Sequence, residues 1–374
     1  MSAFLMNPTQ TRKPALYEQR EVNLSSGDAP VGAESALTRL GFHTWPFHTV
    51  PTPYSIQSLC DRMTLREFLR RLIAAYKNRD DSIANLVWAA VGAGKTHTLR
   101  HLMFLLEKEG FGTVLLVEMP ENAHGMIDLH DAIMSAIGFE KMLEAYFDDQ
   151  SCFEDAPLLL QLCKAAMSGP ELEAAANRWV SGIADLRTVR SLGLPTRISH
   201  DQCVANLVGI LSAVRKGNPK RSVLLIDEFQ RVASAPRRIC NEVQSGLCSI
   251  INRLPVGLGL ILSFAADPSA ALPSWIETNL ASRIGKSQFV PILPLSRTEA
   301  KAFMQDLLLN YATNDLPSPY HPFTEPAINR LIDLSGGERV LPRDLIGNAD
   351  FIFSQYILSD MKTPIGPNDV RLSI

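Results

Sequence analysis

Apolar residues gather in five short runs along the chain, and segments of helical period separate them. The runs cover residues 83–90, 112–119, 222–227, 257–266 and 287–293. Runs that are apolar at nearly every position are typical of strands buried on both faces, as in parallel sheets. The segments between them repeat apolar residues at i, i+3, i+4 and i+7, which is the period of an amphipathic helix. This alternation predicts a doubly wound, parallel α/β sheet.

The same pattern divides the chain into three parts. Residues 1–40 are polar and turn-rich without a sustained period, and we interpret them as an N-terminal arm, either partner-binding or flexible. Residues 41–295 hold the strands and form the predicted α/β domain, with a mainly helical insertion at about 125–215. Residues 296–374 again show helical periods. They predict a small α-helical lid followed by a C-terminal tail.

Composition places the chain among ordinary globular proteins. Of its 374 residues 46% are apolar, and 36 Lys and Arg against 39 Asp and Glu leave a net charge of −3. These values exclude wholesale disorder and a histone-like polycation, while a local basic patch stays compatible with them. The six cysteines form no Cys-x-x-Cys pair, which disfavours a disulfide framework and a zinc ribbon. No apolar run approaches ~18 residues and no secretory signal is visible, so we predict a cytoplasmic protein without a membrane partner.

A glycine-rich segment, Ala-Ala-Val-Gly-Ala-Gly-Lys-Thr at 89–96, follows the first apolar run. It matches the phosphate-binding pattern G-x-x-x-x-G-K-[ST] except that Ala89 replaces the first glycine. Glycines let successive backbone N–H groups turn toward an anion, and the N-terminus of the next helix adds partial positive charge. Lys95 is predicted to reach the β- and γ-phosphates, and the Thr96 hydroxyl to bind Mg²⁺. The predicted cofactors are ATP and Mg²⁺, and the predicted cofactor-binding residues are Gly92, Ala93, Gly94, Lys95, Thr96 and His97.

The third apolar run ends in two adjacent carboxylates, Asp227 and Glu228. Successive side chains of a strand point to opposite faces, so the two acids are expected to have separate tasks. Asp227 is predicted to hold Mg²⁺, and Glu228 to orient and deprotonate an attacking water. Two solvated acids at a strand end are the structural alternative, but the phosphate loop upstream favours catalysis. The predicted activity is Mg²⁺-dependent ATP hydrolysis.

With both motifs in place, the chain resembles the AAA+ ATPases over roughly residues 40 to 350. The resemblance implies three further functional residues. Ser263, near the end of the fourth run, corresponds to the family's polar residue between the metal-bound water and the γ-phosphate. Arg283, just before the fifth run, corresponds to the arginine that reaches the γ-phosphate bound by a neighbouring subunit. Arg343 corresponds to the phosphate-sensing arginine of the lid.

Each of these assignments has a structural alternative. Ser263 could be an ordinary buried strand serine, Arg283 a surface arginine, and Arg339 could take the sensing role in place of Arg343. Pro46 and Phe47 fall where origin-recognition-type members bracket the adenine, although packing alone would also explain them.

Within the AAA+ ATPases the chain is similar to bacterial proteins related to the origin-recognition proteins. These include transposon target-selection ATPases and the ATP-binding components of phage-exclusion systems. The segments LVWAAVGAGKTHTL and VLLIDEFQRV carry this resemblance. It implies a homo-oligomer with sites at subunit interfaces, DNA as a partner, and an effector such as a nuclease or transposase. The implied role is to remodel or regulate a DNA-bound complex in anti-phage defence or mobile-element control.

Seven basic residues lie between 215 and 238, and Arg231, Arg237 and Arg238 follow the strand that ends in the paired acids. In the family that the chain resembles, this edge often faces the channel of a ring, so the three arginines are candidate nucleic-acid contacts. A solvated surface with local ion pairs is the alternative. A second function therefore stays open, a regulatory switch that binds ATP and recruits a protein effector without binding DNA.

Overall fold

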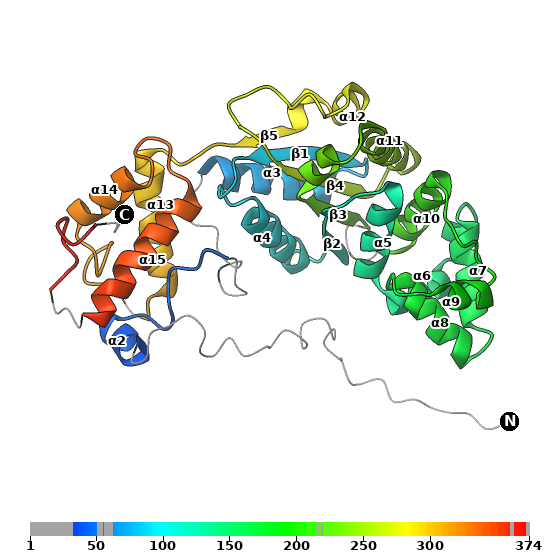
Figure 1. Cartoon of the computed structure of the whole chain (residues 1–374), viewed down its shortest axis with the longest axis horizontal. Helices are drawn as coiled ribbons and strands as arrows, with labels where there is room; N and C mark the ends of the chain where they lie inside the picture. Colours follow the sequence, from blue (N-terminus) through cyan, green and yellow to red (C-terminus); the bar gives the residue numbers. More distant parts are fainter. Residues whose placement is uncertain are drawn as a thin grey trace.

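The computed structural model of the chain describes residues 33–50, 55, 63–215, 217, 220–313, 315–359 and 363–371. A sheet with its covering helices lies between a helical lid at one end and a helical insertion at the other (Figure 1). The predicted arm lies outside the described residues up to residue 32, and its last part, Ala33–Leu40, forms helix α2. None of the described helices is long and apolar enough to cross a membrane.

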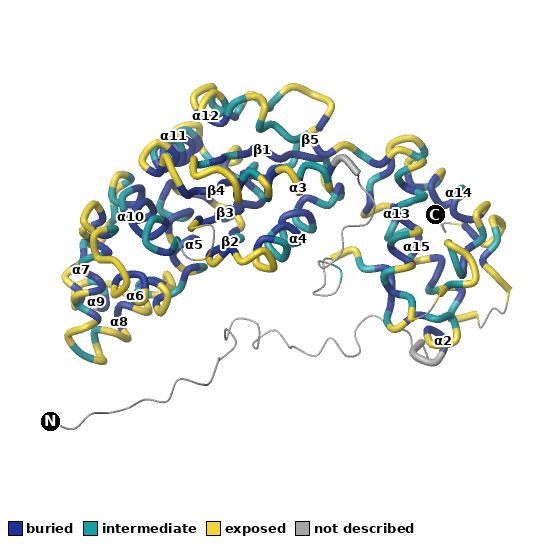
Figure 2. The backbone as a smooth tube through the Cα atoms, turned by 180° about the vertical axis from the view of Figure 1, so that it is seen from behind, coloured by how far each residue is buried: buried dark blue, intermediate teal, exposed yellow. Residues whose placement is uncertain are grey.

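Five parallel strands form one sheet in the order β2-β3-β4-β1-β5, which confirms the predicted α/β architecture. The central strands β3, β4 and β1 are buried along nearly their whole length because helices cover both of their faces (Figure 2). Glu118 at the end of β2 pairs with Asp227 at the end of β3, so the carboxyl ends of these strands meet at one edge. The strands span Ile83–Ala89 (β1), Thr113–Glu118 (β2), Ser222–Asp227 (β3), Leu258–Ala265 (β4) and Phe289–Ile292 (β5).

Alternation along the strands divides the core between the two faces of the sheet. Ile261 of β4 packs in one cluster with Leu69 of α3 and Leu102 of α4. The next residue, Leu262, packs in another cluster with residues of α5, α10, α11 and α12, among them Leu247. These helices span Met63–Asn78 (α3), Lys95–Lys108 (α4), Met126–Ile137 (α5), His200–Ala213 (α10), Arg237–Arg253 (α11) and Thr278–Ile284 (α12).

The segment between β2 and β3 is helical, as predicted, and extends the core away from the lid (Figure 1). Local signals start its helices: proline opens α7 and α8, and the side chains of Asp185 and Ser199 accept backbone N–H groups at the starts of α9 and α10. The other elements of the insertion are Phe139–Asp148 (α6), Gln150–Phe153 (η2), Pro157–Ala166 (α7), Pro170–Val180 (α8) and Leu186–Ser191 (α9).

The lid comprises Arg297–Tyr311 (α13), Glu325–Leu334 (α14) and Pro342–Leu358 (α15). The aromatic connector that precedes the α/β domain completes the core of the lid. Phe47 and Trp45 place their rings 5.4 and 4.9 Å from the Phe353 ring, and Trp45 Nε1–H donates to Asp350 Oδ1 at 2.6 Å. The sequence predicts that the α/β domain begins at residue 41 and so includes these rings. In the structure the rings pack in the core of the lid. Large rings need a deep apolar partner, and α15 provides it.

Candidate active site

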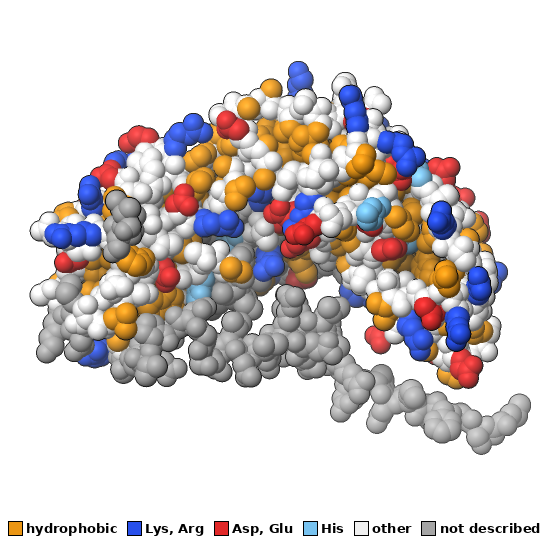
Figure 3. Space-filling view, viewed as in Figure 1, with side chains coloured by type: hydrophobic (Ala, Val, Ile, Leu, Met, Phe, Trp, Pro, Cys, Tyr) orange, Lys and Arg blue, Asp and Glu red, His pale blue; other side chains and the backbone are white. Residues whose placement is uncertain are grey.

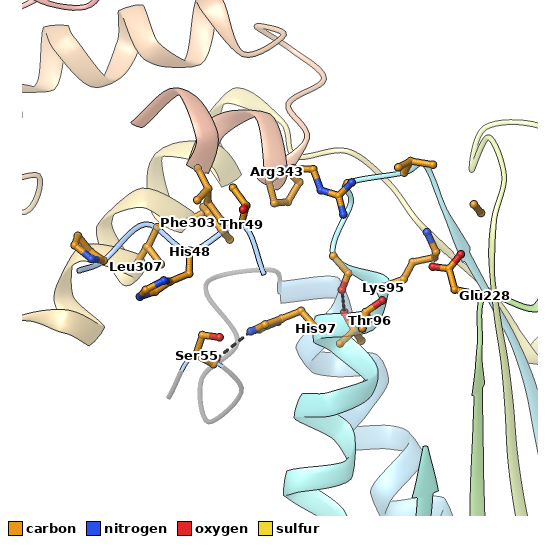
Figure 4. A pocket seen from close by; sticks show the side chains of 18 of the residues that line it. His48, Thr49, Ser55, Lys95, Thr96, His97, Glu228, Phe303, Leu307 and Arg343 are labelled. Atoms are coloured by element: carbon orange, nitrogen blue, oxygen red, sulfur yellow. Dashed lines mark hydrogen bonds between the residues drawn. The ribbon is translucent and has the colours of Figure 1, made fainter. Parts of the chain in front are cut away.

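A cavity of about 210 Å³ opens where the β1–α4 loop, the carboxyl ends of β3 and β4, and the lid meet. Figure 4 shows its two halves: Lys95, Glu228 and Arg343 gather at one end, and Phe303 and Leu307 of α13 line the other. The carboxyl edge of a parallel sheet is where α/β proteins bind ligands, since helix N-termini and loop ends converge there. The cavity therefore combines a charged half with an apolar half.

The loop between β1 and α4 has the backbone of a phosphate-binding loop. Gly92 and Gly94 have φ values of 84° and 92°, in the left-handed region that favours glycine. Gly94 is the N-cap of α4, which begins at Lys95. Ala89 is the last residue of β1 and lies in extended backbone, so its position needs no glycine. The departure from the phosphate-binding pattern therefore leaves the loop intact.

Folding brings the loop and the acidic strand end into direct contact across 131 residues of sequence. The Thr96 hydroxyl donates to Asp227 Oδ2 at 2.6 Å. Lys95 is only 7% exposed. Burial lowers the pKa of Lys95, while the nearby carboxylates of Glu228 and Asp227 act to raise it. A cation, a hydroxyl and the Glu228 carboxylate thus meet at one end of the cavity, with the buried Asp227 carboxylate directly behind the hydroxyl.

Glu228, the residue directly after β3, has a left-handed conformation, with φ 55° and ψ 31°. Among the described residues other than glycine it alone has a positive φ, and such a backbone costs on the order of 1–3 kcal/mol. Its N–H donates to Asp227 Oδ1 at 2.9 Å, which stabilises the turn into the short helix Phe229–Ser234 (η3). The turn separates the two acids: Asp227 contacts Thr96, and Glu228 lines the cavity. Strain of this kind is concentrated at functional sites.

The sequence interpretation missed Gln230, which also lines the cavity. Its amide N–H group donates to the Glu228 carboxylate, and its amide oxygen accepts the Ala265 N–H at 2.8 Å. The signal available in the sequence was a polar residue two positions beyond Glu228, in a segment that otherwise buries Phe229 and Val232.

The lid reaches the phosphate loop through Arg343 near the start of α15. The backbone N–H of Arg343 donates to the Gly92 carbonyl oxygen at 3.2 Å, and its side chain lines the cavity. His97 also lines the cavity, and its Nε2 lies 3.0 Å from the Ser55 carbonyl oxygen (Figure 4). Pro46 lines the apolar half, while Phe47 is buried in the lid.

Four of the predicted catalytic, cofactor-binding and metal residues are not in the cavity lining. Asp227 is 1% exposed behind Thr96, whose hydroxyl it accepts. Ala93 is buried beneath the loop. Ser263 is fully buried two residues inside the end of β4, and its hydroxyl has no hydrogen-bond partner among the described residues. The residue that lines the cavity at the end of β4 is Ala265, which shares a strand face with Ser263 but is the last residue of the strand. Arg283 is exposed on α12.

The basic run between 215 and 238 is not one continuous surface. Arg221 is 1% exposed, and its guanidinium donates to three backbone carbonyl groups and lies 5.0 Å from the centre of the Tyr76 ring. Burial lowers its pKa. Arg221 thus supports the amino end of the sheet, while Lys216 lies outside the described residues.

The three candidate DNA contacts differ in their surroundings. Arg231 donates to the Met119 carbonyl oxygen at 2.7 Å and pairs with Glu118 at 3.5 Å. Arg237 and Arg238 are exposed in the first turn of α11. Cations in the first turn oppose the helix macrodipole, so these two arginines do not stabilise α11. On the face shown in Figure 3, basic and acidic side chains are interspersed.

The donor set fits magnesium better than a transition metal. No group of three or more His, Cys, Asp or Glu that could hold a metal exists within the described part of the chain. The Thr96 hydroxyl and Asp227 carboxylate are hard oxygen ligands that already lie 2.6 Å apart. Mg²⁺ typically takes one or two such protein ligands and completes its shell with water and substrate phosphates.

No protein-family model matches the chain, and no curated protein matches its sequence. Solved structures are similar in fold. Drosophila ORC bound to DNA is 12% identical with a TM-score of 0.50, and the match covers 98% of this chain and 69% of that one. The Aeropyrum pernix ORC2 protein (ADPNP–ADP complexes) is 16% identical with a TM-score of 0.48, and the match covers 86% of this chain and 71% of that one. The ORC1 protein of the same organism in complex with DNA is 14% identical with a TM-score of 0.47, and the match covers 86% of this chain and 66% of that one.

This chain thus spans about two thirds of the length of these proteins. At such identities the likeness concerns the fold alone. Together with the parallel sheet, it shows the α/β fold type of P-loop proteins.

Proposed function

We propose that the protein is an AAA+ ATPase that hydrolyses ATP in the cavity between the sheet and the lid. The observation that carries this proposal is the contact between Thr96 and Asp227 at 2.6 Å, with Lys95 and Glu228 beside it. A cation and a hydroxyl at the start of α4, together with a carboxylate at the end of β3, are the groups that a Mg²⁺-bound triphosphate requires. A measurement of phosphate release from ATP, with Mg²⁺ and with excess chelator, tests it.

Each group in the charged half has a defined task in this proposal. Loop N–H groups and Lys95 bind the β- and γ-phosphates, and Arg343 contacts the terminal phosphate from the lid. Thr96 and Asp227 hold Mg²⁺, which when bound neutralises charge that develops on the transferred phosphoryl group. Glu228 takes the proton of the attacking water, and its left-handed backbone aims the carboxylate into the cavity.

The apolar half of the cavity is suited to the adenine base. Pro46, Phe303, Leu307 and Tyr311 line it, with His48 beside them. A planar base gains apolar burial there and polar contacts at its edge. Because Phe303, Leu307 and Tyr311 belong to α13 of the lid and His48 packs on Tyr311, base binding would couple the nucleotide to the position of the lid.

We further propose that hydrolysis takes place in a homo-oligomer, with Arg283 acting on a neighbouring subunit's site. Arg283 is exposed and is not part of the lining of its own cavity. In Arg283→Ala, ATP hydrolysis is expected to fall at least tenfold while nucleotide affinity is retained, because a cation that stabilises transferred charge is lost. Arg253→Ala, at the exposed far end of α11, is the matched control.

Mixing subunits makes this test specific. Lys95→Ala subunits cannot bind ATP in this proposal but still carry Arg283, so adding them to Arg283→Ala subunits should restore part of the activity. Gel filtration with ATP and Mg²⁺ is expected to show an assembled species, most clearly for Glu228→Gln. A strict monomer under every condition would contradict assembly and leave the nucleotide site itself unaffected.

DNA is the proposed substrate of the assembly, in a role such as anti-phage defence or mobile-element control. Arg237 and Arg238 are exposed at the start of α11, shortly after η3, at a helix end where cations do not stabilise the helix. In the double variant Arg237→Glu/Arg238→Glu, DNA affinity is expected to fall at least tenfold. The plot of log affinity against log salt concentration should become less steep, by the amount that corresponds to about two phosphate contacts. Arg187→Glu/Arg190→Glu on the insertion is the control. If both double variants bound DNA with equal affinity, the DNA proposal would be wrong.

The second candidate is an ATP-dependent switch that recruits a protein effector without binding DNA. Exposed apolar side chains on the insertion favour it: Phe147, Ile183 and Leu186 are 64%, 72% and 60% exposed. ATP hydrolysis measured with and without duplex and single-stranded DNA separates the two functions. Stimulation by DNA supports the first candidate, and nucleotide-dependent protein capture without DNA affinity at low salt supports the second.

A further inference from the structure

Gln230 connects the Glu228 side chain to the end of β4 through two side-chain hydrogen bonds. It belongs to η3, directly after the turn that Glu228 makes. Its amide N–H group donates to the Glu228 carboxylate, and its amide oxygen accepts the Ala265 N–H at the end of β4. Both glutamine hydrogen bonds therefore lie at the mouth of the cavity.

The backbone determines which way the Gln230 amide faces. The Ala265 N–H is a donor whose position is set by β4, so the amide oxygen must face it. The amide N–H group then has to point toward Glu228. The reversed amide would set donor against donor at Ala265 and oxygen against oxygen at Glu228, which is unfavourable at both ends.

No other side chain of β4 takes this place. Ala265 lines the cavity but carries only a methyl group, and the Ser263 hydroxyl is buried inside the strand. The charged groups around Glu228 come from other elements, namely Asp227 of β3, Lys95 of α4 and Arg343 of α15. Gln230 is thus the neutral polar group that ties the predicted base to the sheet.

We propose that Gln230 is a positioning residue for hydrolysis, which holds the Glu228 carboxylate in its working orientation and fixes it to the end of β4. This inference rests on the proposed ATPase function. A glutamate side chain has several rotatable bonds, and a hydrogen bond from a fixed donor removes most of that freedom before the reaction. Such preorganisation acts on the chemical step and leaves nucleotide binding to the loop.

The decisive experiment compares Gln230→Ala and Gln230→Glu with the wild type and with Gln161→Ala. Gln161, on α7 of the insertion, is a matched control because its side-chain amide also donates to backbone groups, the Leu192 and Gly193 carbonyl oxygens. Rates of ATP hydrolysis are measured over a range of pH, together with ATP affinity and thermal stability. Gln230→Ala is expected to lower kcat about tenfold or more, with KM changed less than threefold.

Gln230→Glu keeps the length of the side chain and the acceptor for Ala265, but it sets a second carboxylate against Glu228. Since like charges repel and the donor to Glu228 is lost, Gln230→Glu should lower kcat at least as much as Gln230→Ala, with KM changed less than threefold. A purely structural role would lower the melting temperature and leave kcat unchanged, which would overturn the inference. A wild type that neither binds nor hydrolyses ATP would instead overturn the proposed function, and this inference with it.

Discussion

Replacing Lys95 by alanine is expected to weaken ATP binding at least a hundredfold. The ammonium group is buried at the start of α4, between the phosphate loop and two carboxylates. Burial lowers the pKa of this group, but a triphosphate would add several negative charges beside it and favour the charged form. The variant would leave the phosphates facing Asp227 and Glu228 without the buried ammonium group between them. A hundredfold loss corresponds to about 2.7 kcal/mol, a reasonable magnitude for one charge-assisted contact in a partly buried site.

The measurement for Lys95→Ala is equilibrium binding of ATP and of a non-hydrolysable analogue. Lys108→Ala, at the exposed C-terminal end of the same helix, is the matched control because it removes an ammonium group far from the loop. Thermal unfolding without nucleotide shows whether the variant is folded. Unchanged affinity in a folded Lys95→Ala protein would refute the phosphate site, and with it the enzyme.

The substitution Glu228→Gln is expected to lower kcat by a factor of about 10² to 10⁴ while ATP affinity stays within about threefold. An amide has nearly the same shape as the carboxylate but cannot accept the proton of the attacking water. It also leaves the loop, Lys95 and the Thr96–Asp227 contact untouched. The variant should therefore bind ATP and stall before hydrolysis, which single-turnover measurements would detect directly.

Comparison with Asp227→Asn tests how the two acids divide the work. Asp227 accepts the Thr96 hydroxyl and the Glu228 N–H, so this change affects both the predicted Mg²⁺ shell and the turn that aims Glu228. Asp227→Asn should make hydrolysis require more Mg²⁺, whereas Glu228→Gln should not change the Mg²⁺ requirement. If Glu228→Gln lost ATP binding as completely as Lys95→Ala, the assigned roles would be wrong.

The lid shows what local sequence patterns can predict and what they cannot. Its helices are marked by apolar period and by caps, such as Ser296, whose hydroxyl accepts the Glu299 N–H. The aromatic connector carries no such mark, because rings and prolines show only that a segment is packed, and not where. Trp45 and Phe47 are bound to the lid by contacts with Asp350 and Phe353, more than 300 residues further along the chain.

Amino-acid order alone determined the strands, the phosphate loop and the paired acids, because burial on both faces and the turn into α4 are properties of neighbouring residues. Tertiary structure decided which polar groups meet. It buried Arg221 at the amino end of the sheet, left Ser263 inside β4, and placed Gln230 between Glu228 and Ala265. The physical reason is that hydrogen bonds and burial depend on distances between elements. Strand order and register determine these distances, and the local periodicity of the sequence carries no information about them.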